Sequence, residues 1–173
     1  MTPPDVIDRL MGLRPGDFLS DLRHERPAVR QHSQGSFDAL LNVAQAADLS
    51  PAERDLVALR VATLHACAPL VALHRERLAA LGIGPAAMDA AAAGPDANGA
   101  TAADGFDART VALLRHADLL TLRPIEARPE HLHALADAGL APAAIVTLSQ
   151  LIAFVAYQVR VVAGLTLLER SPA

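Results

Sequence analysis

The chain of 173 residues is poor in the residue types on which several classes of site depend. It has one cysteine, Cys67, no tryptophan, one tyrosine and four phenylalanines. A single cysteine excludes an internal disulfide framework and fits a reducing compartment, so a cytoplasmic location is expected. The sequence has no His-Glu-x-x-His, no glycine-rich phosphate loop and no cysteine and histidine cluster with zinc spacing. We therefore expect neither a metal nor a cofactor.

Lysine is also absent, and the acidic net charge of the chain limits the kinds of partner that it can bind. All 15 basic residues are arginine, and 19 acidic residues leave a formal net charge of −4. Nucleic-acid and anionic-membrane surfaces need a basic excess, so we expect neither partner. The N-terminal residues carry early acids and no apolar run, unlike a secretory signal. The apolar stretch 143–168 contains Arg160, which is costly at mid-bilayer, and we interpret it as a core helix.

Helical periodicity dominates the chain, and no convincing strand run is present, which predicts an all-α fold in one domain, 1–173. Ser50 and Glu53 form a capping box that starts a helix at Pro51. The turn residues of 94–105 predict a flexible linker, for which we favour disorder over a functional lid. The expected helices are Pro4–Leu13, Asp17–Glu25, Pro27 to about Ala46, Pro51 to about Ala66, Ala68–Leu81, Pro85–Ala93, Asp107–Leu122, Pro129–Ala138 and Pro142–Arg170.

The segment around Cys67 has the spacing of a redox site. Pro69 is tolerated in the first turn of a helix, so a helix is expected to start at about Ala68. Cys67 would then lie beside the positive end of that helix, where a thiolate is favoured and the thiol pKa is lowered. His74 follows Leu70 by four residues and shares its face. From Cys67, His74 is seven residues away, a rise of roughly 10 Å and beyond hydrogen-bond reach.

Together with the preceding helix, this pattern resembles the signature of the alkylhydroperoxidase D / carboxymuconolactone decarboxylase-like family. In that family a glutamate, a Cys-x-x-Cys pair and a histidine form a proton relay around a peroxide-reducing dithiol. Asp55 stands at the glutamate position, Cys67 at the first cysteine, Leu70 at the second and His74 at the histidine. The resemblance implies a helical bundle of about eight helices and a homo-oligomer.

The C-terminal run 145–165 also resembles the last helix of the family. With the N-terminal Asp-Arg-Leu-x-Gly-Leu, it is similar to a subgroup that lacks the complete cysteine pair. The residual catalytic site implied by the resemblance consists of Asp55, Cys67 and His74.

Simpler interpretations of these residues stand beside the catalytic one. Cys67 could be a small buried hydrophobe, His74 a packed core histidine and Asp55 a first-turn acid favoured by the helix dipole. His65 could approach the thiol if the chain kinks at Pro69. His131 and His133, two apart on a helix, point to different faces and are interpreted as surface residues rather than a metal pair.

The apolar pattern of the last predicted helix indicates that one of its sides is an assembly surface. Its apolar residues form a seam with alternating spacings of three and four, and others cover the remaining faces, so the helix must be buried on more than one side. Arg160 then needs a partner, for which Asp55, Asp118 and Glu126 are candidates. The seam residues are Ile145, Leu148, Ile152, Val155, Val159 and Val162.

Two functions of different classes follow from the sequence. The first is a homo-oligomeric binding or structural protein without two-cysteine peroxidase chemistry, or with an unassigned pocket activity on a small molecule near His74. The second is a one-cysteine, thiol-dependent hydroperoxide reductase that uses Cys67. Cys67 has no resolving cysteine in its own chain, so the second function needs an external thiol.

Overall fold

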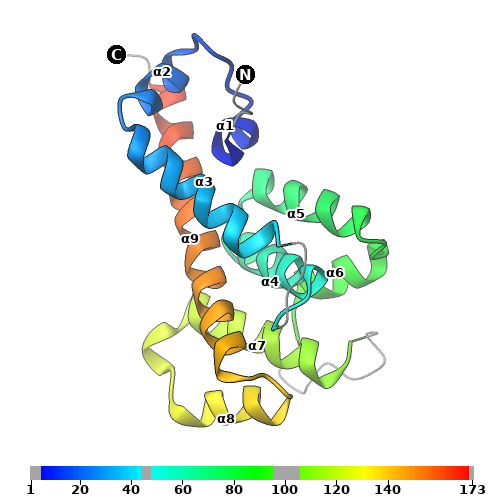
Figure 1. The fold of residues 1–173 in the computed structure, drawn as a ribbon. Helices are drawn as coiled ribbons and strands as arrows, with labels where there is room; N and C mark the ends of the chain where they lie inside the picture. Colours follow the sequence, from blue (N-terminus) through cyan, green and yellow to red (C-terminus); the bar gives the residue numbers. More distant parts are fainter. Residues whose placement is uncertain (1–4, 44–47, 96–105, 172–173) are drawn as a thin grey trace.

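The computed structural model describes residues 5–43, 48–95 and 106–171, and this part of the chain is helical without strands. The all-α fold predicted from the sequence is confirmed (Figure 1). The helices are α1 (Val6–Met11), α2 (Phe18–His24), α3 (Pro27–Leu41), α4 (Pro51–Leu64), α5 (Ala68–Ala80), α6 (Pro85–Ala93), α7 (Ala108–Leu122), the 3-10 helix η2 (Pro124–Glu126), α8 (Pro129–Asp137) and α9 (Pro142–Arg170).

Most predicted boundaries lie within two residues of the observed ones, because prolines and caps mark them locally. The prediction that the third helix reaches Ala46 is wrong, since α3 ends at Leu41 and Asn42 is its C-cap. The short helix η2 was not predicted. Residues 96–105 of the predicted linker lie outside the described residues, so the linker stays a prediction.

The core is organised around α4 and α9. α9 runs along the length of the molecule, from beside α8 to beside α2, and α4 packs against α5, α6, α7 and α9 (Figure 1). Of the six seam residues predicted on the last helix, Leu148, Ile152, Val155 and Val162 are buried in the core, and Ile145 and Val159 are half-buried. α4 starts as predicted, because the Ser50 side chain accepts from the Glu53 backbone N–H at 3.2 Å, and the Glu53 side chain accepts from Ser50 N–H at 2.6 Å.

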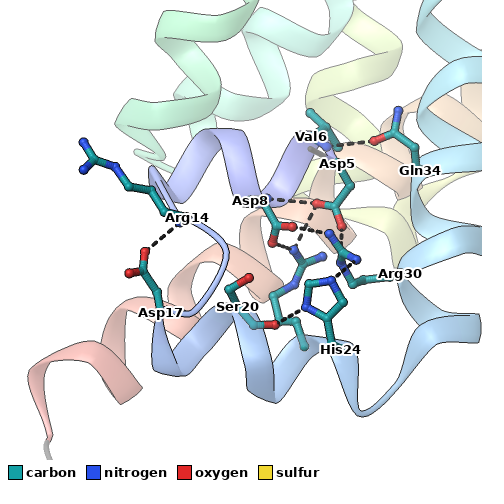
Figure 2. Close-up of polar contacts among 10 residues, drawn as sticks. Asp5, Val6, Asp8, Arg14, Asp17, Ser20, His24, Arg30 and Gln34 are labelled. Carbon is teal, nitrogen blue, oxygen red and sulfur yellow. Dashed lines mark hydrogen bonds and ion pairs between the residues drawn. The ribbon is translucent and has the colours of Figure 1, made fainter. Parts of the chain in front are cut away.

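An ion cluster that the sequence did not predict joins the first three helices (Figure 2). Asp5 is 8% exposed and Asp8 is 4% exposed. Asp5 accepts from Arg23 of α2 at 3.0 Å and from Arg30 of α3 at 2.8 Å, and Asp8 pairs with the same two arginines. Arg30 also donates to His24 Nε2 at 2.8 Å. These contacts fix α1 against α2 and α3.

The prediction that Arg160 is buried and pairs with a carboxylate is wrong. Arg160 is exposed, and its Nη1 donates to the carbonyl oxygen of Ala156, one turn earlier, at 2.8 Å. The proposed partners bind other cations: Asp55 binds Arg77, Asp118 binds Arg60, and Glu126 binds Arg123. α9 is long and apolar enough to cross a membrane by length and composition, a property that core helices share.

Candidate functional site

The candidate site lies at the junction of α4 and α5. The chain reverses between these helices within three residues: His65 is the C-cap of α4, and Cys67 is the N-cap of α5. Between them Ala66 has a φ of 52°, in the left-handed region that side-chain-bearing residues seldom adopt. Pro69 lies in the first turn of α5, as predicted. The tight turn, with its strained alanine, is what brings Cys67 to the start of the helix.

Cys67 is a buried thiol, only 9% exposed. Burial raises the pKa of the Cys67 thiol, and a hydrogen bond from the Leu70 backbone N–H opposes that effect without cancelling it. The prediction of a lowered pKa at the helix start is therefore wrong. The position at the positive end of α5 was predicted correctly, but the loss of hydration disfavours the thiolate more than the helix end stabilises it.

Asp55 and His74 form a hydrogen-bonded pair in the core. His74 Nδ1 lies 2.8 Å from Asp55 Oδ1, and both side chains are 0% exposed. Because a carboxylate can only accept, Nδ1 carries the proton, and in the neutral ring Nε2 is left with a lone pair. His74 Nε2 and Asp55 Oδ2 are buried without a hydrogen-bond partner. The acid and the histidine singled out in the sequence are thus in direct contact.

Arg77 is the third member of the group formed with Asp55 and His74, and it was not predicted from the sequence. Its Nε donates to Asp55 Oδ1 at 2.8 Å, so the carboxylate that holds His74 also faces a guanidinium. Arg77 reaches further, to Asn42 Oδ1 at 2.9 Å and to the carbonyl oxygen of Leu41 at 2.6 Å. Arg77 follows His74 by three residues, so the two share one face of the helix, and this spacing could have identified Arg77 from the sequence. We call Asp55, His74 and Arg77 the α4–α5 polar cluster.

Leu70 and His65 complete the predicted site. Leu70 is 0% exposed and belongs to the same hydrophobic core as Cys67. His65 Nε2 is buried without a partner. Burial, with a smaller contribution from the charge of Arg160, lowers the pKa of His65. Among the hydrogen bonds of the described residues, none joins His65 or His74 to Cys67.

Two cavities lie near these helices. One of about 380 Å³ lies between α1 and α5 and is lined by Arg9, Leu10, Pro69, Ala72, Leu73, Glu76 and Arg77. It meets the α4–α5 polar cluster through Arg77, and neither Cys67 nor His74 lines it. The other, of about 1010 Å³, lies between α7 and α8.

The larger cavity is lined in part by one of the two histidines predicted to lie on the surface. His131 lines it and accepts a hydrogen bond from the Arg128 backbone N–H at 3.0 Å, whereas His133 is exposed as predicted. Among the described residues, no group of three or more histidine, cysteine or carboxylate side chains could hold a metal ion.

Comparison with known proteins supports the fold. No protein-family model matches the sequence, and no curated protein is significantly similar to it. The structure is similar to the crystal structure of an alkylhydroperoxidase AhpD core, an uncharacterized peroxidase-related protein from Ralstonia eutropha JMP134, with a TM-score of 0.70 and 21% identity over 91% of this chain and 78% of that one. It is also similar to an uncharacterized peroxidase-related protein from Silicibacter sp. TM1040, with a TM-score of 0.71 and 16% identity over 92% of this chain and 78% of that one. At these identities the likeness shows the helical fold, and the fold is that of the AhpD core.

Proposed function

We propose that this protein keeps the AhpD-like fold without two-cysteine peroxidase chemistry, and acts as a homo-oligomeric binding or structural protein. It would then represent a subgroup that lacks the complete cysteine pair. The observation that carries the proposal is the state of the only sulfur nucleophile. Cys67 is buried with a raised thiol pKa, and the position three residues later, where a dithiol needs its second sulfur, is the fully buried Leu70.

In this proposal the α4–α5 polar cluster has a structural role. Asp55 belongs to α4, His74 and Arg77 belong to α5, and Arg77 also binds the end of α3. A buried carboxylate is tolerated when it is paired and hydrogen-bonded, and here two donors meet one of its oxygens. The cluster therefore joins three helices. The cavity of about 380 Å³ beside Pro69 and Arg77 is where a small molecule would approach it.

The second candidate is a one-cysteine hydroperoxide reductase, favoured by the position of Cys67 as N-cap of α5. Its thiolate would attack the outer oxygen of an organic hydroperoxide, forming an S–O bond as the O–O bond breaks. Cys67 becomes the sulfenic acid, and the alkoxide leaves and is protonated to the alcohol. An external thiol would then displace water to give a mixed disulfide. A second external thiol would release Cys67 as the thiol and leave the disulfide of the two external thiols.

The two candidates differ in a thiol-dependent peroxidase assay. Wild-type protein and Cys67→Ser are incubated with tert-butyl hydroperoxide and dithiothreitol, and peroxide consumption is measured against a protein-free control. We expect both proteins to match the control, and dimedone to label no sulfenic acid on the wild type. Turnover by the wild type that Cys67→Ser abolishes would instead establish the one-cysteine reductase.

A further inference from the structure

The cavity of about 1010 Å³ between α7 and α8 contains polar side chains that the proposed function does not use. Its volume lies at the upper end of the range of about 300–1000 Å³ that is usual for small-molecule sites. α7 and α8 pack against each other and are joined through η2 (Figure 1). They run antiparallel, because Arg109 near the start of α7 donates to the carbonyl oxygen of Gly139, just beyond the end of α8, at 2.9 Å. Neither Cys67 nor the α4–α5 polar cluster lines the cavity, so a site here is separate from the one that the proposed function uses.

His116 brings a buried polar group without a partner to this cavity. It lies on α7, is 5% exposed and lines the cavity. Its Nε2 is buried, and no group in the described part of the chain hydrogen-bonds to it. Burial, with a smaller contribution from the charge of His131, lowers the pKa of His116, so the ring is neutral at pH 7. A buried ring nitrogen without a partner costs free energy, and a polar atom of a bound molecule would remove that cost.

Three further basic side chains line the same cavity. His131 of α8 lines it from the facing helix, and its Nδ1 accepts from the Arg128 backbone N–H at 3.0 Å, so the neutral ring carries its proton on Nε2. Arg115 and Arg123 are exposed, which places them at the rim. Among the described residues Arg115 has no ion pair, and Arg123 has only the exposed contact with Glu126 at 3.4 Å. This end of the cavity therefore offers N–H donors from two histidines and two arginines.

Three aspartates also line the cavity, and they leave this basic end intact. Asp118 is bound by Arg60 through both of its carboxylate oxygens, at 2.6 and 3.0 Å. Asp107 is the N-cap of α7 and lies nine residues before His116, a rise of roughly 13–14 Å. Asp137 is the last residue of α8, beside the start of α7. The cavity is thus basic at one end and acidic at the other, which favours a ligand with a single negative charge over a doubly charged one.

The wall of the cavity between its two ends is apolar. Val111 and Leu119 of α7 and Leu135 of α8 line it, and all three are buried. An apolar wall binds a hydrocarbon or aromatic group by removing its surface from water. We propose that the cavity binds an organic carboxylate, with the carboxylate group between His116 and His131 and an apolar body against this wall. The carboxylate has two oxygens, so it can accept from the Nε2–H of both rings.

Calorimetric titration of the wild type at pH 7 tests the class of ligand, with octanoate as the probe. We expect saturable binding of one octanoate per chain. Three related molecules should each bind about tenfold more weakly or worse: 1-octanol, which lacks the charge, acetate, which lacks the apolar body, and octyl phosphate, which carries a second charge. The absence of saturable octanoate binding would overturn the proposal, and so would equal binding of any one of the three.

Substitutions test where octanoate binds. His116→Phe, which keeps an aromatic ring at the buried position, should weaken octanoate binding about tenfold, and Arg115→Gln at the exposed rim about threefold. The matched controls His133→Phe and Arg14→Gln, at exposed positions that do not line the cavity, should bind octanoate as the wild type does. Loss of an unpartnered nitrogen should leave the unfolding midpoint of ligand-free His116→Phe unchanged or raised, and Arg115→Gln tests the site independently of how that variant folds. Octanoate binding that neither substitution weakens, or that the controls weaken equally, would overturn the proposal.

Discussion

At the scale of the residue, the reactivity of Cys67 is decided by two opposing effects on one sulfur. The start of α5 offers it a backbone N–H from Leu70, which stabilises the thiolate. Burial removes the water that would stabilise the thiolate better, and the thiol pKa rises as a result. The position typical of a reactive cysteine is therefore occupied by a buried thiol with a raised pKa.

This balance predicts slow alkylation of Cys67 in the folded protein. At pH 7 iodoacetamide should modify the native protein at least tenfold more slowly than the protein in 6 M guanidinium, because the raised pKa and the 9% exposure both reduce the accessible thiolate. The rate is measured by intact-mass spectrometry over time, and in the native state it should still be rising with pH at pH 9. Equal rates in the two states at pH 7 would contradict the assignment of Cys67 as a buried thiol.

Restoring the second sulfur tests whether the scaffold still fits a dithiol. Leu70→Cys sets two cysteines three residues apart at a helix start, the arrangement of Cys-x-x-Cys redox pairs. We expect an intramolecular disulfide on oxidation and a gain of thiol-driven hydroperoxide turnover over the wild type. Loss of the leucine side chain should lower the free energy of unfolding by about 1–3 kcal/mol, since cysteine fills part of the space.

The control for this variant is Leu73→Cys, which adds a buried cysteine to the same helix. Position 73 follows Cys67 by six residues, a rise of roughly 9 Å, which is too far for a disulfide. It should neither form the bond nor gain turnover. A folded Leu70→Cys protein that never forms the disulfide would mean that the two positions are held apart at the junction.

At the scale of the element, two carboxylates join α5 to its neighbouring helices, one buried in the core and one exposed to water. Asp55 of α4 is fully buried and binds Arg77 and His74. Asp89 of α6 binds Arg75 at 2.7 Å, and its side chain is 68% exposed. The two pairs share their chemistry and differ in their exposure to water.

Removing each carboxylate should therefore have very different effects. Asp55→Ala leaves Arg77 and the Nδ1–H of His74 without their acceptor in the core, and should lower the free energy of unfolding by about 3–5 kcal/mol. Asp89→Ala, the matched control, should change it by less than about 1 kcal/mol, because water screens the exposed pair. Both are measured by guanidinium unfolding at pH 7. Similar effects of the two substitutions would argue against a structural role for the α4–α5 polar cluster.

At the scale of the whole molecule, contacts between segments far apart in the sequence hold α9 to the rest of the bundle. Asp48 accepts from Thr147 of α9 at 2.7 Å and from Arg54 of α4 at 2.8 Å. Burial raises the pKa of the Asp48 carboxyl, but hydrogen bonds from Thr147 and the Leu49 N–H, with the charge of Arg54, outweigh it and hold the pKa below its usual value. The charged form of Asp48 is thus bound more tightly in the folded chain than in the unfolded one.

This shift predicts an acid-sensitive contribution to stability. A carboxyl with a lowered folded pKa stabilises the protein above its unfolded pKa of about 3.9, and loses that effect as the pH falls through the folded pKa. Asp48→Asn should therefore cost on the order of 1–2 kcal/mol at pH 7, and the difference from the wild type should shrink below about pH 4. Denaturant unfolding from pH 7 to pH 2.5 measures it, with the exposed Asp137→Asn as the control. A difference that grows as the pH falls would contradict the lowered pKa.

The sequence by itself determined the elements, because the signals that start and stop these helices are local. The capping box at Ser50 and Glu53 and the prolines that open α6 and α9 specify helix starts through contacts within one turn. The absence of a second cysteine likewise excluded a dithiol within the chain. Asp55 and His74 were singled out through their place in a family pattern, and the structure joins them by a hydrogen bond.

Only the tertiary structure decided what these residues experience. The sign of the Cys67 pKa shift, the exposure of Arg160 and the contact of Arg77 with Asp55 depend on which segments pack around each side chain. The sequence showed that α9 is apolar nearly all round, but not which of its faces the protomer leaves uncovered. Burial and electrostatic environment are sums over neighbours that lie far away along the chain, whereas helix starts and stops are set by neighbours along it.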